Sequence, residues 1–129
     1  MDEIVTLLER RSGVDALWLF GSRAQGRARE DSDLDLAALF RRQPSADELL
    51  AMKTEAARLA GREVDLVDLD RASPILAMQV LRHGRLLVDR DPSRRARFVA
   101  AAPGRCEDVL RVRRPVERRL LERVADGGA

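Results

Sequence analysis

The sequence has few of the residues that disulfide-linked, zinc-binding or membrane-spanning proteins depend on. Its 129 residues include one cysteine, Cys106, and one histidine, His83. A single cysteine cannot build a disulfide framework, and neither residue has companions for a zinc site, so we interpret both as structural. The longest apolar runs are far too short to span a membrane, and the N-terminus lacks the basic start and apolar stretch of a signal peptide. These absences predict a cytoplasmic protein with no membrane partner.

Aromatic side chains are equally scarce. The chain has one tryptophan, three phenylalanines and no tyrosine. Trp18, Phe20 and Phe40 lie in apolar runs that are typical of a core, so no residue can be named that would stack on a nucleotide base. With 45% apolar residues, a chain of this length predicts one compact body.

The net charge of +2 hides an asymmetry between two parts of the chain. Residues 92–129 carry ten arginines against five acidic residues, which leaves 14 basic and 17 acidic residues in 1–91. An acidic body with a basic tail predicts that the tail contacts an acidic protein surface or nucleic acid, unless it is only a solvated face. We therefore divide the chain into a domain over 1–91 and a basic helical tail over 92–129, which we expect to bind a partner.

Hydrophobic periodicity and turn residues predict alternating helices and strands. The expected helices cover residues 2–11, 46–60, 74–83 and 92 onward, and the expected strands cover residues 14–20, 32–40, 62–69 and 85–89. This order predicts an α/β (α+β) fold in which a short mixed sheet packs on helices.

Local signals mark the ends of these helices. Ser45 and Ser73 are typical N-cap residues. Gly84 is expected to end a helix in the left-handed conformation, and Pro103-Gly104 is expected to break the tail helix. Beyond that point, Pro115 is expected to kink or restart the helix.

An apolar stripe bordered by arginines runs along the tail, with members three or four residues apart. Its members are Val109, Val112, Val116, Leu120 and Val124. A stripe of this kind is typical of a partner-binding helix, although packing on the protein's own core is an alternative.

The stretch GSRAQGRAREDSDLDL, which begins at Gly21, joins a glycine-rich turn to a pair of aspartates directly after a predicted buried strand. Asp33 and Asp35 are two residues apart in a strand, so both side chains project to one face. Two such carboxylates repel unless they are protonated or bridged by a cation, and oxygen ligands suit Mg²⁺. Gly21 and Gly26 frame a loop whose N–H groups can approach an anion, and Ser22 adds a hydroxyl donor. Together these features predict a site for Mg²⁺ and phosphate.

This stretch resembles the signature of the nucleotidyltransferase superfamily, in which Gly-Ser is followed by Asp-x-Asp, in the spacing of the minimal nucleotidyltransferases (MNT). The match is continuous over residues 21–36, and the order of elements extends it to about residue 90. The resemblance implies a small nucleotidyltransferase fold of the DNA polymerase beta type, with ATP as nucleotide donor and Mg²⁺ as cofactor. It also implies an antitoxin whose partner is a HEPN-domain ribonuclease toxin.

The family pattern also requires a third carboxylate on a later strand. Asp65 matches that position, whereas Asp68 lies an odd number of residues away and therefore on the opposite face of a regular strand. The resemblance thus implies that Asp33, Asp35 and Asp65 are catalytic residues and metal ligands. It implies nucleotide-binding roles for Gly21, Ser22, Arg23 and Gly26.

The implied reaction is Mg²⁺-assisted transfer of AMP from ATP to a hydroxyl of the HEPN toxin, with tyrosine as the expected acceptor. Because the chain has no tyrosine, it cannot be its own tyrosine acceptor. Two alternatives stay open, namely an inactive antitoxin that neutralises the toxin by binding, and an enzyme that modifies a small-molecule hydroxyl. The chain leaves no further domain to form walls around a small acceptor. Nucleic acid is not expected as a direct substrate, because no second domain could hold a template.

Overall fold

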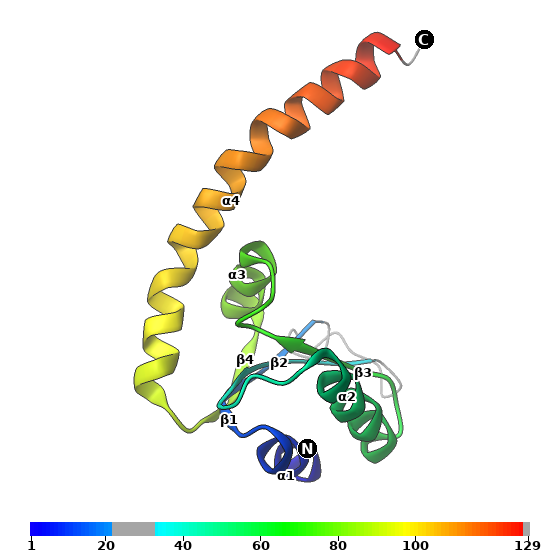
Figure 1. Ribbon diagram of the computed structural model, residues 1–129, viewed down its shortest axis with the longest axis vertical. Coiled ribbons are helices and arrows are strands. Elements are labelled where there is room, and N and C mark those ends of the chain that lie inside the picture. Colours follow the sequence, from blue (N-terminus) through cyan, green and yellow to red (C-terminus); the bar gives the residue numbers. More distant parts are fainter. Residues whose placement is uncertain (22–32, 128–129) are drawn as a thin grey trace.

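The computed structural model describes the backbone of residues 1–21 and 33–127, with side chains up to residue 111 (Figure 1). Its elements, in chain order, are α1 (Asp2–Arg11), β1 (Val14–Phe20), β2 (Leu34–Phe40), α2 (Ala46–Ala60), β3 (Val64–Asp68), α3 (Pro74–His83), β4 (Arg85–Asp89) and α4 (Pro92–Gly127). The predicted α+β fold is confirmed. β2 and β3 each begin two residues later than expected.

The strands form one mixed sheet in the order β3-β2-β1-β4. β1 pairs antiparallel with both β2 and β4, whereas β2 and β3 run parallel. The starts of β2 and β3 therefore lie at the same end of the sheet as the end of β1. Residues that directly precede or open these two parallel strands are brought together at that end.

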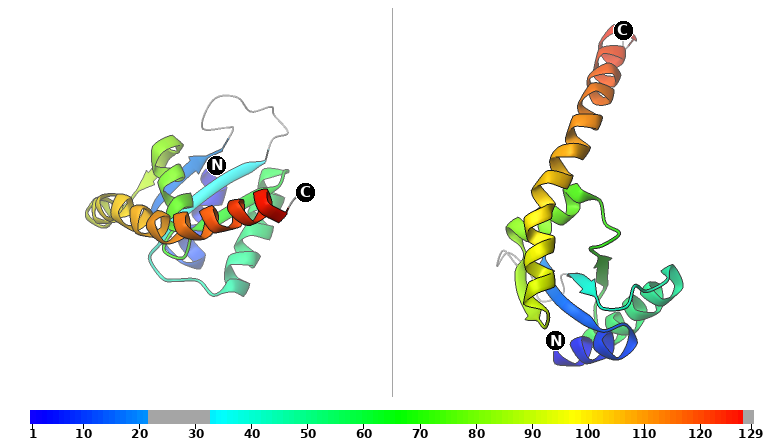
Figure 2. Two further views of the ribbon diagram at one scale, coloured as in Figure 1. Left: turned by 90° about the horizontal axis from the view of Figure 1, so that it is seen from above. Right: turned by 60° about the vertical axis from the view of Figure 1, so that its left-hand side comes forward.

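Helices cover both faces of the sheet (Figures 1 and 2). α1 and α2 pack on one face, where Leu17, Leu36 and Met52 are fully buried. The other face is covered by α3, whose Ala77 and Val80 pack against Leu39 and its neighbours on the sheet. Alternate residues of each strand therefore enter two separate apolar layers, one on each side of the sheet.

The predicted N-caps of α2 and α3 are confirmed by their hydrogen bonds. The Glu48 N–H donates to Ser45 Oγ, and the Leu76 N–H donates to Ser73 Oγ, each over 3.1 Å. These bonds satisfy N–H groups that the first helical turn leaves without a partner.

Gly84 ends α3 as predicted, but its predicted left-handed conformation is wrong. Its φ of −79° and ψ of 160° are extended. A Cβ on Gly84 would lie 3.2 Å from the carbonyl oxygen of Leu19 and closer still to that of Val80. Glycine is therefore required here because a side chain would overlap the Val80 carbonyl of α3 itself and crowd the Leu19 carbonyl of β1, and not because of a positive φ.

The break predicted at Pro103-Gly104 is also wrong, because α4 runs as one helix from Pro92 to Gly127. A proline removes one backbone donor and can bend a helix without ending it, and alanines at 100–102 favour the helix on its N-terminal side. Figure 1 shows α4 curving gently and extending beyond the body. Because the helix also passes through Pro115, no restart occurs there.

The first turns of α4 pack on the body of the protein. Phe98 lies against the apolar layer beneath α3, and Ala102 is 3% exposed. Further along, Leu110 is exposed. Among the helices that the structure describes, none combines the length and apolar character needed to cross a membrane.

Candidate active site

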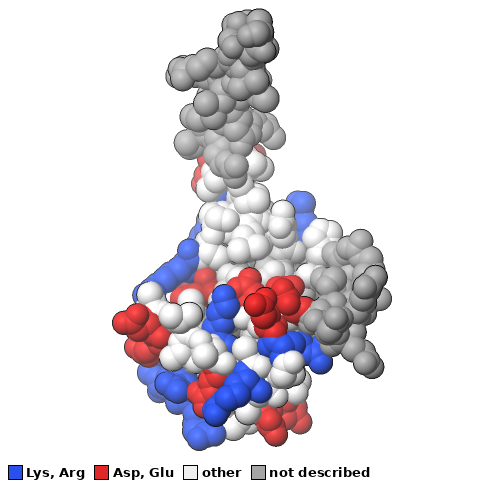
Figure 3. Space-filling model, turned by 90° about the vertical axis from the view of Figure 1, so that its right-hand side faces the viewer, with Lys and Arg blue, Asp and Glu red and all other residues white. Residues whose placement is uncertain are grey.

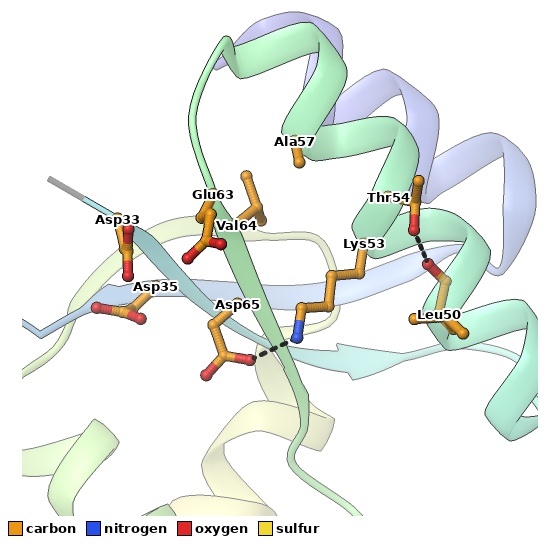
Figure 4. A pocket seen from close by; sticks show the side chains of 9 residues that line it. All are labelled: Asp33, Asp35, Leu50, Lys53, Thr54, Ala57, Glu63, Val64 and Asp65. Carbon is orange, nitrogen blue, oxygen red and sulfur yellow. Dashed lines mark hydrogen bonds and ion pairs between the residues drawn. The ribbon is translucent and has the colours of Figure 1, made fainter. Parts of the chain in front are cut away.

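The parallel pairing of β2 and β3 places the predicted carboxylates side by side. Asp35 and Asp65 are direct partners in the register of the two strands, and Asp33 lies just before β2. Figure 4 shows the three carboxylates around one space at the edge of the sheet. We call the end of the sheet formed by these three aspartates the acidic end.

Strand alternation explains why these side chains face solvent. Leu34 and Leu36 flank Asp35 in sequence and are buried in the layer beneath α1 and α2. On the opposite face, α3 covers only the later part of β2, where Leu39 is fully buried. The early part of both parallel strands stays accessible, and the Asp65 side chain is 53% exposed.

Asp68 lies on the other side of β3, as its spacing from Asp65 predicted. It is 5% exposed and accepts hydrogen bonds from the Gln43 side chain and, at 3.2 Å, from the Asp70 N–H. These contacts lie at the far end of the strand from Asp33 and Asp35. Asp68 is therefore a structural residue, and Asp65 is the carboxylate that joins the pair.

Among the described residues, the acidic end carries more negative charge than its basic neighbours balance. Partial burial raises the pKa of Asp35, and the nearby charges of Asp65 and Asp33 raise it further. A hard cation with oxygen ligands would remove this repulsion, so the donor set fits Mg²⁺. As the side chains stand, however, no three acidic, histidine or cysteine residues in the described part of the chain are gathered closely enough to hold a metal ion.

Gly21 closes the acidic end from the side of β1. Its φ is +76°, and a Cβ on it would overlap the carboxylate of Asp35, with the carboxyl carbon at only 3.1 Å. Both the backbone conformation and the space therefore require glycine. The other predicted nucleotide-binding residues, Ser22, Arg23 and Gly26, lie outside the described residues.

A pocket of about 500 Å³ opens beside the aspartates. One wall is formed by a face of α2 that includes Leu50 and Lys53, and the opposite wall includes Glu63. Lys53 reaches from α2 to Asp65, with its Nζ 3.6 Å from Asp65 Oδ1 (Figure 4). Figure 3 views the molecule from the side of α2 and β3 and shows acidic side chains next to basic ones.

Sequence reasoning missed Lys53 and Glu63 as site residues. One signal was available for Lys53, because it is the only lysine among 24 basic residues. Its position opposite Asp65 was not visible, since it depends on how α2 packs beside β3.

A family model described as "Polymerase beta, Nucleotidyltransferase" matches residues 2–93 of the chain. Among curated proteins, the protein adenylyltransferase MntA of Thermococcus cleftensis is 36% identical over 75 residues, which cover 58% of this chain and 76% of the relative.

Solved structures share the fold over nearly the whole chain. A chain from a crystal structure of a toxin–antitoxin complex with AMP-PNP superposes with a TM-score of 0.80 at 24% identity, covering 93% of this chain and 98% of that one. A chain from the complex of the tri-AMPylated Shewanella oneidensis HEPN toxin with its MNT antitoxin gives a TM-score of 0.78 at 22% identity, covering 93% and 94%.

Proposed function

This chain belongs to the polymerase beta nucleotidyltransferase family, and we propose that it transfers AMP from ATP to a hydroxyl group of a HEPN-domain partner protein. The observation that carries the proposal is the direct pairing of Asp35 with Asp65 in parallel strands, beside Asp33 and open to solvent. The relative MntA is named a protein adenylyltransferase. The complex of similar fold contains an AMPylated HEPN toxin.

Asp33 and Asp35 would hold Mg²⁺, and Asp65 would complete a second metal position. The metal would offset negative charge on the transferred phosphate and on the leaving pyrophosphate. The protein's own contribution is to present three carboxylates from two strands whose register fixes their spacing. In this scheme the protein contributes mainly by positioning the reacting groups, and it forms no covalent bond with them.

The donor side of the site would bind the triphosphate. Backbone N–H groups near Gly21 and Gly26, with the Ser22 hydroxyl and the Arg23 guanidinium, would bind β- and γ-phosphate oxygens. The absence of a side chain on Gly21 leaves the Asp35 carboxylate room beside this turn.

On the acceptor side, the hydroxyl oxygen attacks the α-phosphorus, the bond to the β-phosphate oxygen breaks, and pyrophosphate leaves. Asp65 lies on the pocket side of the site and would take up the hydroxyl proton as a general base. Because the chain contains no tyrosine, a tyrosine acceptor would belong to the partner.

We assign partner binding to the tail over residues 92–129 and nucleotide transfer to residues 1–91. The exposed Leu110 beyond the packed turns of α4 supports this assignment. A chain that ends after Arg111 keeps Phe98 and Ala102 on the body, so it should stay folded while it loses affinity for the partner. Calorimetric titration of this chain with the partner is the measurement, and undiminished affinity would place the interface elsewhere.

Mass spectrometry of the intact partner tests the reaction. A cognate HEPN-domain protein should gain the mass of one or more AMP units after incubation with the chain, ATP and Mg²⁺. The Asp35→Ala variant should leave the mass unchanged. Neutralisation of the partner without a mass gain would favour an antitoxin that acts by binding alone. A mass gain only on a small-molecule acceptor would favour an enzyme that modifies a small-molecule hydroxyl.

A further inference from the structure

We infer that Lys53 is a positioning residue. It holds Asp65 apart from the other aspartates and releases it when the metal–nucleotide complex binds. The inference rests on the proposed function, because it concerns how the third carboxylate joins the site. It adds a residue that the family motif does not contain.

The first observation is the distribution of the basic residues. The chain uses arginine at every basic position except one, and that exception lies in the pocket with the three aspartates. An arginine guanidinium forms a rigid, often bidentate pair with a carboxylate, whereas a lysine ammonium is a compact charge on a flexible stem. A lysine can therefore hold a carboxylate and still release it.

The second observation is that Asp65 lies between a like-charged neighbour, which repels it, and a lysine, which attracts it. On one side, Asp35 is its neighbour in the sheet, and on the other side, Lys53 reaches toward it from α2 (Figure 4). The Lys53 ammonium is 3.6 Å from Asp65 Oδ1. As the side chains stand, the described acidic residues do not form a three-ligand metal set.

The third observation concerns the energy of the pair. The Lys53 and Asp65 side chains are 45% and 53% exposed, and exposed ion pairs stabilise a fold by at most about 1 kcal/mol. Fold stability therefore gives little reason for this pair. A weak pair at this position has another effect, because a cation that binds Asp65 must displace the ammonium or share the carboxylate with it.

The consequence is an order of assembly. Asp33 and Asp35 would engage the first Mg²⁺ with the triphosphate while Lys53 still neutralises Asp65. Asp65 would join afterwards, when the positive charge of the second metal replaces that of the ammonium. Lys53 thus lowers the affinity of the site for Mg²⁺ and reduces repulsion among the aspartates before the metal binds.

Calorimetric titration with Mg²⁺, in the presence of α,β-methylene-ATP, tests this inference without turnover. In this analogue the bond that must break is not hydrolysable. Lys53→Met should bind Mg²⁺ about three- to tenfold more tightly than the unmodified chain, because Asp65 is released. Lys53→Arg keeps the charge and should not tighten binding.

Arg58→Met is the matched control, because it removes one positive charge from the same helix outside the pocket. Arg58 is 78% exposed and pairs with Glu55. The Arg58→Met variant should leave the Mg²⁺ affinity unchanged. In an Asp65→Asn background, Lys53→Met should have no further effect on that affinity. Equal effects of Lys53→Met and Arg58→Met, or an effect that persists with Asp65→Asn, would overturn the inference.

A second measurement serves if Lys53→Met fails to fold. Reductive ¹³C-methylation keeps the positive charge and labels only Lys53 and the terminal amine, because no other lysine exists. The Lys53 NMR signal should move when Mg²⁺ and the analogue are added, toward its position in the Asp65→Asn protein. A signal that Mg²⁺ does not move would overturn the inference even if AMP transfer occurs, whereas the expected shift without AMP transfer would overturn only the proposed function.

Discussion

The two ends of the sheet differ in how many of their acidic side chains are paired with basic ones. At the end where β2 and β3 finish, acidic side chains are paired with arginines from α4 and the loops. We call this set the arginine end: Glu9, Asp15, Asp68, Asp70 and Asp89, with Arg41, Arg71, Arg90, Arg94 and Arg95. At the acidic end, one of the three aspartates, Asp65, has a basic partner within the described residues, and that partner is Lys53.

The pKa values follow this difference. Burial acts to raise the pKa of Glu9, but hydrogen bonds from the Val14 N–H, Arg41 and Arg90 outweigh it and lower the pKa to about 2. The pKa of Asp35 is raised instead, by burial and by its like-charged neighbours. The same residue class therefore stabilises the fold at one end and destabilises it at the other, which is how a binding site for a cation differs from a structural ion network.

The largest effect is expected from removing a carboxylate at the acidic end. Asp33→Ala and Asp35→Ala should each lower AMP transfer by about a thousandfold, a barrier increase of about 4 kcal/mol, because each loses a metal ligand. Single-turnover transfer to the partner, followed by mass spectrometry, is the measurement. A loss of less than about tenfold would exclude that residue as an essential ligand.

At the arginine end, Arg94→Met should instead lower stability. Arg94 ties α4 to Asp15, at 3.0 Å, and to Asp70, and the Asp15 side chain is 9% exposed. Leaving these carboxylates without their partner should reduce the free energy of unfolding by about 2–3 kcal/mol. Urea denaturation measures this loss of stability. Arg97→Met is the control, since Arg97 is exposed and, within the described part of the chain, donates only to the Ser93 hydroxyl. Equal losses for the two variants would show that the ion network at this end contributes little.

Glu9→Gln should reveal a pH dependence with the sign of a lowered pKa. Ionised Glu9 stabilises the fold above its ordinary pKa of 4.5, and this contribution is lost as the pH falls through about 2. The unmodified chain should exceed Glu9→Gln in stability by about 1 kcal/mol at neutral pH, since the side chain is partly exposed. Urea denaturation at a series of pH values should show the difference shrinking below pH 4.5 and vanishing near pH 2. A difference that is constant over this window would contradict the assignment.

The smallest effect is a gain in stability at the acidic end. Asp35→Asn, with EDTA present, should raise the free energy of unfolding at neutral pH by on the order of 0.5 kcal/mol, because it removes repulsion between neighbouring strands. Since the pKa of Asp35 is raised in the fold above its usual 3.8, the unmodified chain loses stability as the pH rises through that pKa, so the gain should disappear below 3.8. Asp108→Asn, at an exposed position on α4, should show no such gain.

Much of this arrangement could be predicted from local patterns. The bounds of α1 and β1 follow from apolar spacing and from Ser12-Gly13 and Gly21, which interrupt that spacing. The separation of Asp65 from Asp68 follows from strand alternation alone. In both cases the deciding interactions lie within one element.

The features that were missed depend on contacts between elements. A glycine at position 84 could be required for its φ or for the space it leaves, and only the positions of the Val80 and Leu19 carbonyls around it decide between them. Pro103 is compatible with a bend or with an end, and the packing of Ala102 beside it holds the helix in place. Lys53 and Asp65 are far enough apart in sequence that no local pattern connects them.

The parallel pairing of β2 and β3 works like a reading frame for the site, because its register decides which residue of β3 lies opposite Asp35. A slip of one residue in β3 would place Val64 or Leu66 opposite Asp35 and turn Asp65 into the apolar layer. Only a slip of two residues would bring another acid, Glu63, to that position. Single-residue insertions next to Asp65 should therefore behave as frame errors, which a compensating deletion in the same strand can correct and no substitution at Asp68 can.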